Sequence, residues 1–174
     1  MEYTFTLKYQ LADDDRDPDV LVDRLGDAGC DDALVGIGQP GRLALEFTRE
    51  AADADAAVRS ALAAVRSAVP SAKLIEVAPD LVGLTDVADI VGVSRQNMRK
   101  LMLAHPGSFP TPVHEGSASI WHLADVLAWL QAKGSYSLAK DVLDVARVAL
   151  QVNVAKEGQR LPRSASEKLQ ALVG

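Results

Sequence analysis

The sequence predicts an α+β protein made of three successive segments. Residues 1–79 alternate strand and helix patterns in the order β-α-β-β-α-β. Residues 80–134 have two short helix patterns around a tight turn, followed by a hairpin and a closing helix. Residues 135–174 form a C-terminal helical segment. This order indicates a sheet covered by helices, followed by a separate and mainly helical unit.

Four stretches of the first segment have strand patterns, either alternating or continuously apolar. They are residues 3–11, 33–37, 43–47 and 73–77. One intervening helix begins at Asp17 and Pro18, a favourable N-cap and N1 pair, and the other spans residues 53–69. The order is that of the ferredoxin-like arrangement, with four antiparallel strands and two helices on one face. Such a module binds a small molecule, dimerises or docks a protein, and the sequence leaves these alternatives open.

The second segment has the spacing of a helix-turn-helix. Thr85 is a candidate N-cap for the first helix. The apolar face of this helix consists of Val87, Ile90 and Val91. Gly92 stands at the corner, where a helix favours a left-handed residue, and Ser94 is a candidate N-cap for the second helix.

The second helix, residues 94–104, is the predicted DNA-reading element. Its inward-facing residues are Met98, Leu101 and Met102. In a helix-turn-helix this helix lies in the major groove, with its N-terminal residues on base edges. The residues expected to contact bases are Arg95, Gln96 and Arg99, because Arg suits guanine and Gln suits adenine. The residues expected to contact phosphates are Thr85, Ser94, Asn97 and Lys100.

Residues 81–133 resemble the AlpA and phage-excisionase regulators. The resemblance is carried by residues 108–113 (SFPTPV), a polar turn at 115–117, Ile120-Trp121 and residues 125–130 (DVLAWL). These regulators are small winged-helix proteins related to the DNA-binding domain of MerR-type regulators. The resemblance implies that both helices and the hairpin wing contact DNA, the wing usually through basic residues. This wing has no Lys or Arg, and His114 is its candidate for contacting the DNA backbone.

Negative charge is concentrated in the first segment. The net charge of the chain is −6. Residues 1–79 hold 8 Lys and Arg against 15 Asp and Glu, a net charge of −7. The corresponding net charges are −1 for residues 80–134 and +2 for residues 135–174. No acidic residue occurs from Ser94 to Ala104. We therefore expect a basic face on the helix of residues 94–104, although the chain as a whole is acidic.

Catalytic, metal and membrane signals are weak. The single Cys30 excludes an internal disulfide, and the histidines are too widely spaced for a zinc site. The Asp13-Asp15-Asp17 spacing of a calcium loop is followed by Pro18 and Arg24 at positions that need Gly and Glu. No catalytic triad or carboxylate pair stands out, so we expect neither enzymatic activity nor a cofactor. With no signal-peptide pattern and no apolar run of about 20 residues, we expect a cytoplasmic protein without a membrane partner.

The third segment begins with a long helix pattern over residues 138–156. Leu138, Val142, Val145, Ala149 and Val152 have the 4-3-4-3 spacing of a coiled-coil seam. The seam either forms a homodimer or folds back on the N-terminal domain of its own chain. Ser164 and Glu167 have the spacing of a capping box for a last short helix.

Together these patterns predict a sequence-specific DNA-binding protein, a bacterial transcriptional regulator acting on double-stranded DNA as a homodimer. The alternative is a protein-interaction adaptor, for instance an antitoxin or a defence-system component. In that case the acidic N-terminal domain would bind a protein partner; in a regulator it could instead bind a small-molecule effector. The acid-free helix favours DNA binding, and the wing without basic residues favours the adaptor.

Overall fold

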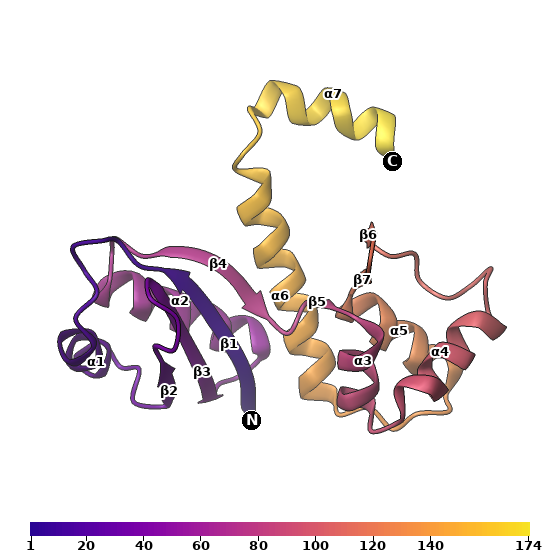
Figure 1. The fold of residues 1–174 in the computed structure, drawn as a ribbon, viewed down its shortest axis with the longest axis horizontal. Coiled ribbons are helices and arrows are strands. Elements are labelled where there is room, and N and C mark those ends of the chain that lie inside the picture. Colours follow the sequence, from indigo (N-terminus) through magenta and orange to yellow (C-terminus); the bar gives the residue numbers. More distant parts are fainter.

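A four-stranded antiparallel sheet forms the first part of the protein (Figure 1). The computed structural model describes all residues from 1 to 174. The elements of this part are β1 (Glu2–Gln10), α1 (Pro18–Asp27), β2 (Ala33–Gly36), β3 (Arg42–Glu50), α2 (Ala54–Ala68) and β4 (Lys73–Ala78). The strand order across the sheet is β2-β3-β1-β4. The predicted order of strands and helices along the chain is confirmed.

Alternate residues of β1 face the core between the sheet and its helices. Phe5 lies opposite Phe47 of β3, and their rings stack with centroids 5.3 Å apart. Leu21 and Leu25 of α1 are buried in the same core. Asp17 caps α1 as predicted, and its side chain accepts from the N–H groups of Asp19 and Val20. Asp53 caps α2 in the same way, accepting from the N–H of Ala56.

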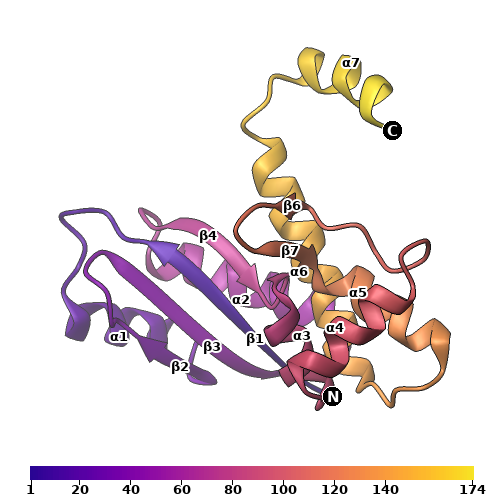
Figure 2. The ribbon, with the colours of Figure 1, turned by 45° about the vertical axis from the view of Figure 1, so that its right-hand side comes forward.

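The second part contains a three-stranded antiparallel sheet and three helices (Figure 2). Its elements are β5 (Leu81–Val82), α3 (Leu84–Val91), α4 (Arg95–Ala104), β6 (His114–Glu115), β7 (Ser119–His122) and α5 (Leu123–Lys133). The strand order is β5-β7-β6. A second core, built around Met98, Trp121 and Leu127, lies among these elements.

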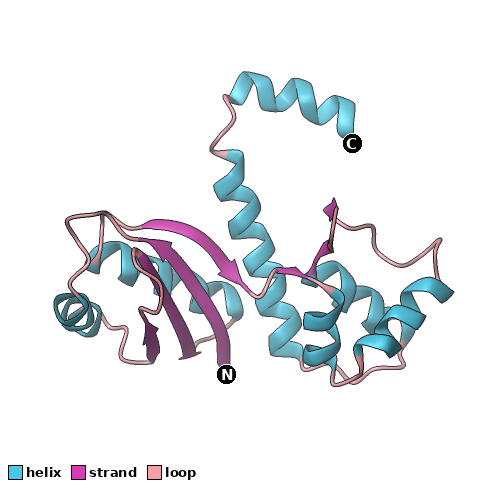
Figure 3. Cartoon of the chain, in the orientation of Figure 1, coloured by secondary structure: helices cyan, strands magenta, loops and turns pink.

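Helix α6 (Lys140–Gly158) lies between the two parts and contributes to both cores (Figure 3). Val145, Val148 and Ala149 belong to the first core, whereas Leu143 and Ala146 belong to the second. Of the two alternatives for the predicted seam, the structure therefore has the one in which the helix packs on its own chain. Of the predicted seam, Val145 and Ala149 are buried, and Leu138, Val142 and Val152 are partly buried against the two cores. The homodimer itself stays a prediction.

The last helix, α7 (Arg163–Val173), extends from the tip of α6 and has no buried residue (Figure 1). The predicted capping box of Ser164 and Glu167 does not form. Pro162 is the N-cap residue instead, and no side chain caps this helix. None of the seven helices combines the length and apolar character needed to cross a membrane.

Candidate nucleic-acid interface

The corner between α3 and α4 is held by backbone geometry that the sequence predicts. Gly92 has φ of 79°, in the left-handed region, and its N–H donates to the carbonyl of Ala88 at 2.9 Å. Ser94 begins α4, and its Oγ accepts from the N–H of Asn97 at 3.1 Å. Both predicted roles are confirmed. The two helices are therefore joined by a short turn of defined conformation.

The start of α3 differs from the prediction, because Gly83 and not Thr85 is the N-cap residue. The N–H of Gly83 donates to Oδ2 of Asp86 at 2.8 Å, so the carboxylate in the first turn does the capping. Thr85 is an exposed residue of that first turn. The apolar face is also displaced: Val87 is fully buried, whereas Ile90 is 38% exposed.

The outer face of α4 is polar and unpaired. Met98 is fully buried in the second core and fixes which face of the helix points outward. The exposed residues include Arg95, Gln96, Asn97, Arg99 and Lys100. None of these five side chains takes part in an ion pair or a hydrogen bond within the chain. Their donors are therefore free to bind another molecule, as the sequence analysis expects of a DNA-reading helix.

The wing is held against the second core by aromatic residues. The N–H of Val113 donates to the carbonyl of Ile120 at 2.8 Å and closes the hairpin. Nε1 of Trp121 donates to the carbonyl of Pro110 at 3.0 Å. The ring of Phe109 meets Trp121 and Trp129 edge-on, with centroids 6.0 and 5.1 Å away. Both tryptophans therefore anchor the wing and α5.

At the tip of the wing, the imidazole of His114 lies over Gly116. His114 is exposed on β6. A Cβ atom added at Gly116 would come within 2.6 Å of Nε2 of His114. The glycine therefore leaves room for the imidazole, and a larger residue would displace it from this position.

A groove of about 430 Å³ separates α4 from the wing. The groove is lined by the start of α3, by Arg95, Arg99 and Met102 of α4, and by residues 116–121 of the wing. It brings together three of the predicted DNA contacts: Thr85, Arg95 and Arg99. The other predicted contacts are exposed on the surface but do not line this groove: Ser94, Gln96, Asn97, Lys100 and His114.

The groove has two guanidinium groups on one side and the uncharged wing residues 116–121 on the other. Its acidic residue is Asp86, whose Oδ2 accepts the hydrogen bond from Gly83. Gly83 and Asp86 were not predicted as groove residues, because a glycine has no side chain that marks it as a cap. The arrangement offers Arg donors to an anionic or hydrogen-bonding ligand.

Comparison with known proteins finds no relative of this chain. No family model, curated protein or solved structure matches the chain. No group of three or more His, Cys, Asp or Glu side chains is arranged to hold a metal ion.

Proposed function

We propose that this protein is a sequence-specific DNA-binding protein, a transcriptional regulator of the bacterial cytoplasm. In this proposal residues 1–79 are a ferredoxin-like domain and residues 80–134 a winged helix-turn-helix domain of the AlpA and excisionase kind. One observation carries the proposal. The exposed cationic side chains of α4 have no partner within the chain, and two of them face a groove beside the wing.

The role of each residue follows from its place on α4. Arg95, Gln96 and Arg99 belong to the N-terminal half of the helix, which reaches base edges when the helix lies in the major groove. Lys100 and Asn97 are exposed and suit phosphate contacts. The Ser94 hydroxyl accepts from Asn97 and still has its own hydrogen to donate to a phosphate. Thr85 of α3 and His114 of the wing would contact the DNA backbone on either side of α4.

Double-stranded DNA is the proposed partner, and the test is selection from a random pool. Duplexes with a randomised central region are captured on the full-length protein at stated salt and sequenced over several rounds, since affinity depends on salt. The proposal expects one enriched motif. The protein should bind a duplex with this motif at least about 10³-fold more tightly than random duplex. A pool that stays random, or enrichment by charge alone, would reject sequence-specific binding.

A homodimer remains part of the proposal, because two linked copies would read two half-sites. The α6 seam is covered within the chain, so the dimer must use another surface. Sedimentation of the full chain at tens of micromolar tests this point. A mass of twice 18.5 kDa supports the dimer, and a monomer at that concentration excludes it.

The alternative is a protein-interaction adaptor, and a specific observation favours it. Residues 1–79 carry a net charge of −7, and the wing has no Lys or Arg to hold a phosphate. An antitoxin or defence-system component would use that acidic domain to bind a basic protein. In a regulator, the same domain would instead bind a small-molecule effector. Failure of the duplex selection, together with a folded protein, would favour the adaptor.

A further inference from the structure

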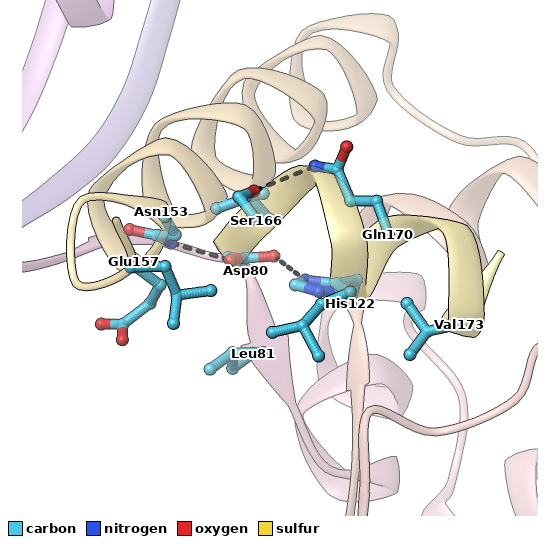
Figure 4. A pocket seen from close by; sticks show the side chains of 12 residues that line it. Asp80, Leu81, His122, Asn153, Glu157, Ser166, Gln170 and Val173 are labelled. Atoms are coloured by element: carbon cyan, nitrogen blue, oxygen red, sulfur yellow. Dashed lines mark hydrogen bonds and ion pairs between the residues drawn. The ribbon is translucent and has the colours of Figure 1, made fainter. Parts of the chain in front are cut away.

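A second cavity, of about 460 Å³, lies on another side of the protein where β5, the end of β7, α6 and α7 meet (Figure 4). It shares no lining residue with the groove beside α4. Five of its twelve lining residues are apolar: Leu81, Val154, Leu161, Leu169 and Val173. These five side chains are between 47% and 83% exposed, so the cavity is an open cleft with uncovered apolar walls. Clefts of this volume are typical of sites for small organic ligands.

The floor of this cavity is a hydrogen-bonded network around Asp80. Asp80 is 1% exposed, and its two carboxylate oxygens have separate partners. Oδ1 lies 2.7 Å from Nδ1 of His122, and Oδ2 accepts from Nδ2 of Asn153 at 2.7 Å. Asn153 in turn bonds to both the N–H and the carbonyl of Val77, each at 2.8 Å. The network therefore ties β4, the wing strand and α6 together before any ligand arrives.

The network leaves one nitrogen available to the cavity. An ionised carboxylate only accepts hydrogen bonds, so Nδ1 of His122 carries the hydrogen that is shared with Asp80. In the neutral imidazole, Nε2 then has a free lone pair. No hydrogen bond within the chain uses Nε2, and His122 lines the cavity with its side chain 18% exposed. With a neutral His122 in this tautomer, the cavity presents a hydrogen-bond acceptor at its floor.

The charges around the cavity select the kind of ligand. No Lys or Arg is among the lining residues, and Asp80 forms no ion pair with either type. Glu157, the other carboxylate of the lining, is balanced by Lys156 at 2.8 Å and by Arg160 at 3.1 Å. With a neutral His122, the charge of Asp80 is buried beside no cation, a costly state that a bound cation would relieve.

We propose that this cavity binds an organic amine with an apolar body. The ammonium group donates a hydrogen bond to Nε2 of His122 and is attracted by the carboxylate of Asp80 behind it. The apolar body contacts the five aliphatic side chains of the walls. This site does not depend on the proposed DNA binding, because binding of the amine is measured without DNA.

Three probes with one tail and different head groups test the proposal: 4-phenylbutylamine, 4-phenylbutan-1-ol and 4-phenylbutyrate. Their affinities for the full-length protein are measured by calorimetry at pH 8. The proposal expects saturable binding of the amine, at least about tenfold tighter than the alcohol, and the weakest binding for the carboxylate. Absence of saturable amine binding up to about 1 mM, or equal affinity for amine and carboxylate, overturns the proposal.

Variants separate the head-group contact from the walls. Asp80→Asn should reduce amine affinity about tenfold and leave the alcohol unchanged, because it removes charge and keeps shape. Leu169→Ala should weaken amine and alcohol alike, by about fivefold, through lost apolar contact. Leu34→Ala is the matched control, since Leu34 is an exposed leucine of β2 that does not line the cavity. Unchanged amine binding in both cavity variants contradicts the assignment.

A spectroscopic measurement covers the case in which Asp80→Asn does not fold. Nitrogen-15 NMR of the histidine rings follows His105, His114 and His122 in the unmodified protein during amine titration. The Nε2 signal of His122 should move with the calorimetric binding curve, whereas that of His114 should stay in place. A His122 signal that does not respond overturns the proposed contact.

Discussion

The arginines of this protein divide into those with partners inside the chain and those without. Arg49 is the clearest of the first kind: its guanidinium donates to both carboxylate oxygens of Asp32, at 2.7 and 2.8 Å, and to the carbonyl of Gly29 at 2.8 Å. Arg95 and Arg99 are of the second kind, exposed and unpaired. A side chain that does nothing for the fold is available for binding, and this contrast supports the proposed role of α4.

The ion pair of Asp32 and Arg49 predicts a pH-dependent contribution to stability. The hydrogen bond from Arg49 lowers the pKa of Asp32 from its ordinary value. A carboxyl group with a lowered pKa stabilises the fold above its unfolded-state pKa of about 3.9, and this contribution disappears as pH falls through the folded-state pKa. Asp32→Asn should therefore lower the free energy of unfolding by roughly 1–3 kcal/mol at pH 7 and by much less under strongly acidic conditions.

Urea unfolding of both proteins at neutral and acidic pH measures this difference. Asp55→Asn is the control, because Asp55 pairs with Arg59 on the surface and should contribute under about 1 kcal/mol. A difference between wild type and Asp32→Asn that stays constant down to the lowest pH would contradict the assignment.

At the scale of elements, the corner between α3 and α4 depends on one glycine. Gly92 has φ of 79°, a conformation that costs an L-residue with a side chain roughly 1–2 kcal/mol. Gly92→Ala should therefore lower the free energy of unfolding by about that amount, although no atom lies within 4 Å of the added Cβ. Gly107→Ala is a matched control, since its surroundings are equally open and its φ is not positive. Equal stabilities of the two variants in thermal unfolding would show that the corner carries no such strain.

Most of the element boundaries could be predicted from local signals. Asp17, Gly92 and Ser94 act within one helical turn, and each has its predicted role. The start of α3 could not be predicted in the same way, because Gly83 has no capping side chain of its own and relies on Asp86. Local patterns identify a cap when the capping side chain belongs to the cap residue itself.

Contacts between distant residues set the limit of prediction from sequence. The seam of α6 was visible as a 4-3-4-3 pattern, but a periodic pattern does not name the surface that covers it. In the structure that surface is the chain's own pair of cores. The Asp80 network was not predicted at all, because His122 lies 42 residues and Asn153 lies 73 residues further along the chain. For the candidate interface, the residues of α4 were predicted, whereas the groove beside the wing required the structure.

For the whole molecule, α6 is the element that joins the two parts. It supplies buried residues to both cores, whereas α7 supplies none. A chain ending at residue 160 should therefore keep its melting temperature within about two degrees, since loss of exposed residues usually costs under 0.5 kcal/mol. A chain ending at residue 138 should lose its cooperative transition. A stable, cooperative fold for the shorter chain would contradict the structural role of α6.

The central claim is that α4 contacts DNA, and the salt dependence of duplex binding tests it most directly. For the site found by selection, wild type is compared with Arg95→Ala, Lys100→Ala and the core variant Met98→Ala. Arg95→Ala should lose roughly 1–3 kcal/mol of binding free energy and relax the preference at one or two base pairs. Lys100→Ala should weaken binding to all duplexes alike and lower the salt slope by about one ion.

Both variants should keep wild-type stability, whereas Met98→Ala should lose roughly 2–5 kcal/mol of folding free energy. Wild-type affinity and wild-type salt slope in folded Arg95→Ala and Lys100→Ala proteins would contradict the claim that α4 binds DNA.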